Sequence, residues 1–251
     1  MSTAPTPPIK GFLPSSLVEW EGLIASEVFL PGCNFRCPQC HNRALVLEPH
    51  SLPDVPLDDV LKHLREHRKW IDGVVVSGGE PTIHAGLPEL LKILRGVGMR
   101  IKLDTNGSNP DVLQALLEQR LVDFVAMDVK APLDARYSLV AGVEVDSDAI
   151  RRSIELVMAA SVQYEFRTTV CPEFLKEEDV LEIARQLKGA RRVVLQAFRP
   201  VDCLDKTLES VLPYSEEALR RMAERARRFV PGCVVRGEAD DEGSTALRET
   251  R

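Results

Sequence analysis

Residues 32–42 read GCNFRCPQCHN, and this stretch constrains the fold and the chemistry of the chain more than any other. It holds three thiols within eight residues, Cys33, Cys37 and Cys40, and no fourth cysteine follows nearby. Cysteine thiolates hold iron–sulfur clusters, and a cubane cluster normally takes four of them. A local set of three leaves one iron without a protein ligand, and an open coordination position distinguishes a catalytic metal site from a structural one. The spacing therefore predicts a cluster whose free iron binds another molecule.

A zinc site is the main alternative for these cysteines. Three thiolates and His41 form a Cys3His set, and both ligand types suit zinc. Zinc sites usually draw their ligands from two separated pairs, whereas His41 directly follows Cys40 and is poorly placed to reach the same ion. The spacing favours a cluster over zinc but does not exclude zinc by itself.

Composition limits the class of protein. The chain has 251 residues, of which 44% are hydrophobic, and α/β barrels of this length commonly form a single domain. It has neither an apolar run of about 18 residues nor an N-terminal secretory pattern, so we expect no membrane partner. Its net charge of −6 gives no reason to expect nucleic acid. Six cysteines in a charged chain fit the reducing cytoplasm, and Cys171, Cys203 and Cys233 are expected to be packing residues or thiols without a metal.

Short apolar runs alternate with apolar residues at helical spacing along most of the chain. The runs predict strands at residues 23–30, 73–76, 100–103, 122–127, 162–170 and 192–195, with a short last strand at 233–236. The segments between them predict helices, one beginning at Asn109-Pro110, one capped by Ser147 and a last one over residues 215–228.

Strands that alternate with helices predict a parallel sheet with right-handed crossovers. About six βα units can be counted, fewer than the eight of a closed barrel. We therefore expect an α/β fold, a partial (βα)6 TIM-like barrel that is open on one side. Residues 18–237 are expected to form this domain, after an N-terminal extension (1–17) and before a polar, disordered C-terminal tail (238–251).

Unusual polar residues lie at the ends of the predicted strands. The cysteine loop follows the first strand, SGGEP (77–81) the second, DTNG (104–107) the third and DVK (128–130) the fourth. Arg167 lies within the fifth strand, and QAFRP (196–200) ends the sixth. In such sheets, ligands bind at the carboxyl ends of the strands. Each motif alone is also an ordinary turn sequence, but their order along the chain argues against coincidence.

Together these motifs resemble the radical S-adenosylmethionine superfamily. The individual motif sequences are more specific, because they are similar to those of the activating enzymes of glycyl radical enzymes. They are CHN (40–42), GGEP (78–81), LDTNG (103–107) and MDVK (127–130). Within these enzymes, the chain most resembles the branch labelled anaerobic ribonucleoside-triphosphate reductase activating protein. The resemblance covers residues 23–205, most of the chain.

The resemblance implies one [4Fe–4S] cluster and S-adenosylmethionine as cofactors. Cys33, Cys37 and Cys40 would hold the cluster, and its free iron would bind the amino and carboxylate groups of S-adenosylmethionine. Reductive cleavage would then give a 5′-deoxyadenosyl radical that abstracts hydrogen from the target. The residues expected to bind the cofactor are Gln39, Gly78, Gly79, Glu80, Asp104, Asn106, Asp128, Lys130, Arg167 and Gln196.

The resemblance implies one further ligand, and the chain departs from the family pattern at one position. In the related pyruvate formate-lyase activases, the positions of Asp104, Thr105 and Asp128 hold a monovalent cation, and the resemblance extends that cation to this chain. The residue before the last cluster cysteine is usually aromatic in the superfamily, whereas this chain has Gln39. An amide can bond the edge of adenine but stacks on it less well, and Phe35 either compensates or belongs to the core.

The predicted function is abstraction of hydrogen from a backbone glycine of a glycyl radical enzyme, with anaerobic ribonucleotide reductase as the expected partner. No ferredoxin-like cysteine pattern interrupts residues 41–71, so a flavodoxin or ferredoxin is expected to supply the electron. A radical enzyme acting on a small molecule, like the 7-carboxy-7-deazaguanine synthases, is the alternative. A non-catalytic iron–sulfur or zinc protein would leave Glu80 and Arg167 without a purpose.

Overall fold

The computed structural model describes residues 4–236, and its strands form one eight-stranded sheet in which spatial order equals chain order. Strand β1 is antiparallel to β2, and every later neighbouring pair is parallel. The strands are β1 (Gly11–Ser16), β2 (Ala25–Leu30), β3 (Gly73–Gly78), β4 (Arg100–Thr105), β5 (Phe124–Asp128), β6 (Gln163–Val170), β7 (Val193–Ala197) and β8 (Cys233–Val235). Because β1 and β8 are the two edges, the sheet is open, as predicted.

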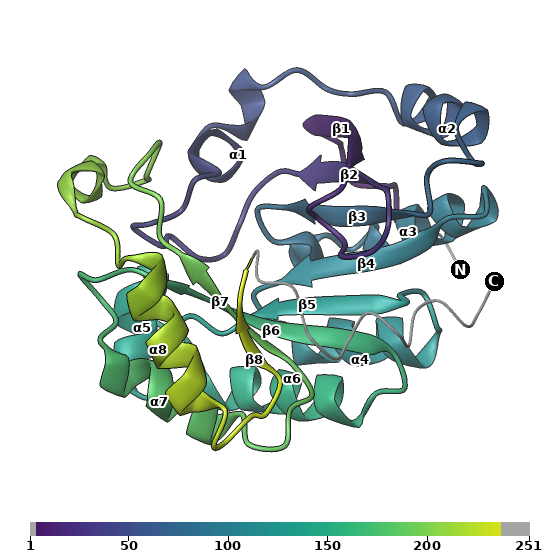
Figure 1. The fold of residues 1–251 in the computed structure, drawn as a ribbon. Coiled ribbons are helices and arrows are strands. Elements are labelled where there is room, and N and C mark those ends of the chain that lie inside the picture. Colours follow the sequence, from purple (N-terminus) through teal and green to yellow (C-terminus); the bar gives the residue numbers. More distant parts are fainter. Residues whose placement is uncertain (1–3, 237–251) are drawn as a thin grey trace.

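One or two α-helices follow each of the strands β2 to β7, which confirms the predicted six βα units. Figure 1 shows the helices surrounding the curved sheet, with α1 beside the loop that leaves β2. None of the helices in the described part of the chain is long and apolar enough to cross a membrane. The helices are α1 (Arg43–Leu47), α2 (Leu57–Glu66), α3 (Leu87–Gly96), α4 (Pro110–Glu118), α5 (Ala135–Ala141), α6 (Ser147–Ala159), α7 (Glu177–Gln186) and α8 (Glu216–Ala226).

The two faces of the sheet differ in chemistry because successive strand residues point to opposite sides. One face packs against the helices and is apolar; Leu103 and Phe166, for example, are fully buried in the main core. The other face of the same strands carries charged residues, among them Lys102 and Arg167, which are also buried. The apolar face holds the fold together, and the charged face lies inside the partial barrel, where the site is built.

Some local predictions were wrong or incomplete. Strand β1 was not predicted, and it brings residues 11–16 of the expected N-terminal extension into the sheet. The helix-capping side chain of α6 is Asp146, which accepts from the amides of Asp148 and Ala149, and not Ser147. Ser215 caps α8, accepting from the amide of Ala218. The predicted polar tail lies outside the described residues, whereas Cys171, Cys203 and Cys233 are buried.

Candidate active site

The cysteine loop is held in place by segments that are distant in sequence. Two carbonyl groups of the loop accept hydrogen bonds, Cys40 O from Leu204 N (2.9 Å) and Pro38 O from Asp205 N (2.9 Å). The amide of Arg36 donates to the carbonyl oxygen of Ala141, the last residue of α5 (2.8 Å). All three cysteines are partly exposed, and none forms a disulfide. The loop is therefore held by two distant segments, residues 204–205 and the end of α5, and it presents three thiols at the edge where the strands end.

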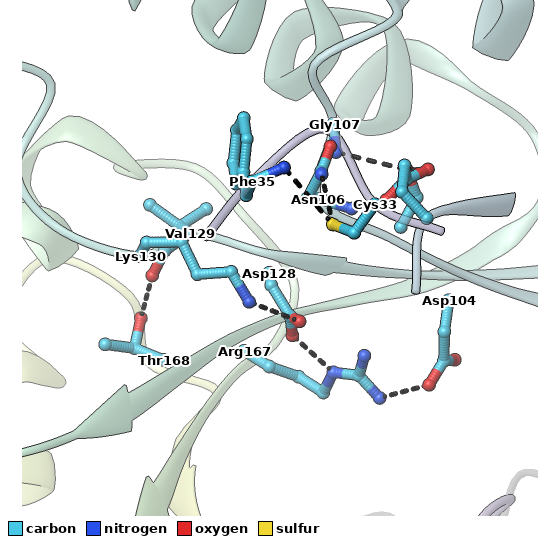
Figure 2. A network of polar contacts seen from close by, with 12 residues as sticks. Cys33, Phe35, Asp104, Asn106, Gly107, Asp128, Val129, Lys130, Arg167 and Thr168 are labelled. Carbon is cyan, nitrogen blue, oxygen red and sulfur yellow. Dashed lines mark hydrogen bonds and ion pairs between the residues drawn. The ribbon is translucent and has the colours of Figure 1, made fainter. Parts of the chain in front are cut away.

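Polar groups surround the first of these thiols (Figure 2). Phe35 N donates to Cys33 Sγ at 3.3 Å, and Asn106 Nδ2 lies 3.9 Å from the same sulfur while bonding Asn34 Oδ1 at 2.9 Å. Burial raises the pKa of Cys33 to about 11 and also raises the pKa of Cys37, so both are neutral thiols before metal binding. Coordinated thiols are deprotonated, and hydrogen bonds to cluster sulfurs tune the reduction potential.

His41 is oriented away from a shared zinc site. Its Nε2 lies 2.7 Å from the carbonyl oxygen of Arg199, and its ring stacks on Phe198. Within residues 4–236, no three His, Cys, Asp or Glu side chains converge as they would around a single ion. Cluster thiolates bind separate irons and need not converge in this way. The donor set that remains is all sulfur, which suits an iron–sulfur cluster.

The glycine pair at the end of β3 lets this strand approach the start of the cysteine loop. A Cβ on Gly78 would lie 2.2 Å from Leu30 O, and one on Gly79 would lie 1.7 Å from Gly32 O. The amides of Gly79 and Glu80 donate to these same two carbonyl oxygens, at 2.9 and 2.8 Å. Both glycines therefore permit close backbone contact between β3 and the cysteine loop, while their contact with the cofactor stays a prediction.

Glu80 is 1% exposed and joins the ends of β3 and β4. Its Oε1 accepts from Thr82 N (3.0 Å), Thr105 Oγ1 (2.7 Å) and the Thr82 hydroxyl, and its Oε2 accepts from Asn106 N (2.6 Å). Burial raises the pKa of Glu80 although these donors oppose the shift. Since Oε1 is saturated, only Oε2 has capacity for the ammonium group that the sequence analysis assigned to this carboxylate.

Four of the predicted cofactor-binding residues form a single charged network (Figure 2). Arg167 bridges two carboxylates, with NH1 2.8 Å from Asp104 Oδ2 and Nε 2.8 Å from Asp128 Oδ1. Lys130 Nζ holds the other oxygen of Asp128, also at 2.8 Å. Burial alone would raise the pKa of Asp128, but the two cations lower it well below its ordinary value. This carboxylate is therefore ionised throughout the neutral range.

Gln39 is buried, and its Oε1 has no hydrogen-bond partner within the described residues. A buried acceptor without a partner costs about 1–3 kcal/mol, so a ligand with N–H donors would fit there. Phe35 is buried in the main core. Gln196, with its amide oxygen turned toward β8, accepts from NH1 (3.0 Å) and Nε (3.2 Å) of Arg236, so it does not join the charged network.

A second layer of charges, not predicted from the sequence, lies inside the barrel. Lys102 is 2% exposed, and its Nζ lies 3.7 Å from Glu165 Oε1 and 3.8 Å from Asp104 Oδ1. Glu27 is buried beside it, and burial together with Glu19 and Asp104 raises the pKa of Glu27 to about 8. The missed signal was a charged residue at alternate positions of β4 (Lys102 and Asp104) and β6 (Glu165 and Arg167), together with the single charge of Glu27 in β2, where an apolar residue is usual.

The raised pKa of Glu27 makes the stability of the fold dependent on pH. Between the ordinary pKa and about 8, the folded state keeps a proton that the unfolded state has released, so the free energy of unfolding falls as pH rises. Each pH unit in this window removes about 1.4 kcal/mol. Glu27→Gln should abolish most of this decline in urea titrations from about pH 5 to about pH 9, whereas Glu155→Gln, on an exposed face of α6, should not. An unchanged slope in Glu27→Gln would contradict the assignment.

The family model named Radical SAM superfamily matches residues 28–187. A Methanocaldococcus jannaschii protein named as a glycyl-radical enzyme activating enzyme is 29% identical over 91% of this chain and 95% of its own length. The 7-carboxy-7-deazaguanine synthase of Methanopyrus kandleri is 32% identical over 51% of this chain and 59% of that enzyme. The solved structure of TYW1 with a lysine-pyruvate adduct bound has the same fold, with a TM-score of 0.61 and 16% identity over 83% of this chain and 76% of that one.

Proposed function

Because the chain belongs to the radical S-adenosylmethionine superfamily, whose enzymes use a [4Fe–4S] cluster and S-adenosylmethionine, we propose that it activates a glycyl radical enzyme. The observation that carries the proposal is the set of three partly exposed thiols fixed at the ends of the strands, with a buried charged network beside it. The near full-length similarity to a protein named as a glycyl-radical enzyme activating enzyme supports this reading over others.

Cys33, Cys37 and Cys40 would hold the cluster, because they are unbridged and supply only sulfur. When bound and reduced, the cluster supplies the electron that splits S-adenosylmethionine into methionine and a 5′-deoxyadenosyl radical. Asn106 and the amide of Phe35 would donate to the Cys33 sulfur and stabilise its negative charge.

The residues of this chain would bind and orient S-adenosylmethionine between the cysteine loop and the charged network. Gln39 Oε1 is available for an amine of the adenine ring, since nothing in the described part of the chain bonds it. Glu80 Oε2 would accept a hydrogen bond from the ammonium group of the methionine part. The Nη2 group of Arg167 would donate to the carboxylate or ribose oxygens of S-adenosylmethionine. Gly78 and Gly79 would support this arrangement by holding the loop against β3.

The proposed substrate is a backbone glycine in a loop of a partner protein, and anaerobic ribonucleotide reductase is the partner that the motifs favour. An open sheet leaves one side of the barrel free of strands, and a protein loop needs more room there than a metabolite. A flavodoxin or ferredoxin is the proposed electron donor. A radical enzyme acting on a small molecule is the second candidate, and the shorter match to a 7-carboxy-7-deazaguanine synthase favours it.

Two measurements test this function in sequence. The anaerobically reconstituted and reduced protein should convert S-adenosylmethionine to 5′-deoxyadenosine, and absence of cleavage would reject the superfamily chemistry. Adding the candidate reductase should then produce a glycyl radical signal in electron paramagnetic resonance, and a reductase whose radical glycine is replaced by alanine should give none. Cleavage without any glycyl radical, together with formation of 7-carboxy-7-deazaguanine, would support the second candidate instead.

A further inference from the structure

The three residues expected to bind a monovalent cation are already engaged with other groups of this chain. Thr105 Oγ1 donates to Glu80 Oε1 at 2.7 Å and accepts from Gly107 N at 3.1 Å. Asp104 Oδ2 accepts from Arg167, and both oxygens of Asp128 accept from Arg167 and Lys130. A monovalent cation at this site would have to be coordinated by the side-chain oxygens of Asp104, Thr105 and Asp128. All but one of these oxygens already bond another group of the chain.

The exception is Asp104 Oδ1, which is buried and accepts no hydrogen bond from the part of the chain that the structure describes. Its nearest charged neighbour is Lys102 Nζ at 3.8 Å, and the Arg167 guanidinium holds the other oxygen of the same carboxylate. At about 4 Å, two like charges repel by about 4 kcal/mol near a protein surface. An alkali cation at this oxygen would therefore lie among positive groups, so the residues present do not fit the cation that the resemblance implied.

We propose that the guanidinium of Arg167 is a built-in replacement for the monovalent cation, bridging Asp104 and Asp128, so that this chain binds no alkali cation between these carboxylates. The proposal rests on the proposed function in one respect, which is that Asp104 and Asp128 lie beside the bound cofactor. Strand register produces the bridge: Arg167 pairs directly with Asp128 across β5 and β6, and Asp104 lies on the neighbouring strand β4.

A side chain differs from a dissolved ion in two respects. Arginine stays protonated at every physiological pH, and its planar fork binds two carboxylates in a fixed geometry. The side chain of Arg167 is 8% exposed, so water does not screen the pairs strongly. The site is therefore charge-balanced whatever the concentration of sodium or potassium, and Asp104 and Asp128 keep their positions before the cofactor arrives.

The test measures cation binding directly and does not depend on catalysis. Thallium(I), a probe for potassium, is followed by thallium NMR on the purified protein, and Tm is compared in potassium chloride and in tetramethylammonium chloride at equal ionic strength. The wild-type protein should bind no thallium(I), and its two Tm values should agree. Thallium(I) binding that Asp128→Asn abolishes, or a higher Tm of the wild type in potassium chloride, would overturn the proposal.

Arg167→Gln supplies the complementary result, because it leaves the two carboxylates without their bridge. This variant should gain thallium(I) binding, and potassium should raise its Tm by roughly 2–6 °C. If the folded variant bound no thallium(I), the proposal would be wrong.

Arg136→Gln is the matched control, since Arg136 also joins two carboxylates, Asp134 and Asp179, but its own side chain is 43% exposed. It should gain no thallium(I) site. Arg167→Lys retains a cation and should also bind none, which keeps the test decisive if Arg167→Gln does not fold. If the wild-type protein did not cleave S-adenosylmethionine but the thallium(I) and Tm results were as expected, the proposed function would be rejected. The proposal of an Arg167 bridge would still stand.

Discussion

Cys37→Ala is expected to abolish cluster binding and to reduce cleavage of S-adenosylmethionine to the background rate. The three thiols are the only sulfur donors of the loop, and two of them cannot hold a cubane cluster that already lacks a fourth protein ligand. Iron analysis after anaerobic reconstitution should give about four irons per wild-type chain and close to none in the variant. Formation of 5′-deoxyadenosine should fall in parallel.

Cys171→Ala is the control for this experiment. Cys171 is buried after the end of β6, where it belongs with Phe198 and Cys203 to a small apolar cluster and is not one of the three loop thiols. Its replacement should cost about 1 kcal/mol of stability and leave the iron content unchanged. Equal iron content in Cys37→Ala and Cys171→Ala would contradict the assignment of the cluster to this loop.

The second large effect is expected from Gly79→Ala. The added Cβ would lie 1.7 Å from the carbonyl oxygen of Gly32, a distance that no real contact reaches. The end of β3 must then move away from the cysteine loop and break the hydrogen bonds from Gly79 N to Leu30 O and from Glu80 N to Gly32 O. We expect a loss of about 3–5 kcal/mol in the free energy of unfolding. Cluster content should also fall at least roughly tenfold, because the displaced backbone leads directly into Cys33.

Gly96→Ala serves as the matched substitution. Gly96 is the last residue of α3, and a Cβ there meets nothing within 4 Å. Alanine in this helix should leave stability unchanged or increase it by up to about 1 kcal/mol. Chemical denaturation of both variants tests the contrast, and a similar free energy of unfolding for the two would show that close packing at Gly79 does not limit stability.

The main strands and helices could be predicted because their signals are local. Six βα units follow from apolar runs that alternate with helical spacing, and parallel topology brings the motifs to one edge. Strand β1 escaped prediction because its sequence, GFLPSS, contains a proline and little alternation, and it exists through its pairing with β2. Helix α5 was missed for a related reason, since seven residues are too few for a clear period.

The partners of the site residues could not be predicted in the same way. Arg167 was expected to contact the cofactor, yet it bridges Asp104 and Asp128, because the register of β4, β5 and β6 aligns them. Glu80 was expected to meet an ammonium group, yet four donors of the chain already bond it. In both cases the group of this chain that the side chain bonds depends on strands from other parts of the chain.

The sequence by itself determined the all-sulfur donor set of residues 33–40, the alternation of strands and helices, and the edge at which the motifs gather. These properties follow from spacing within one segment and from the period of apolar residues, which need no knowledge of neighbours. Only the tertiary structure decided that Gln39 Oε1 has no hydrogen-bond partner among residues 4–236, that Glu80 ties two strands together and that a guanidinium lies between the two aspartates. Each of these depends on strand register and sheet curvature, which bring together side chains that are distant along the chain.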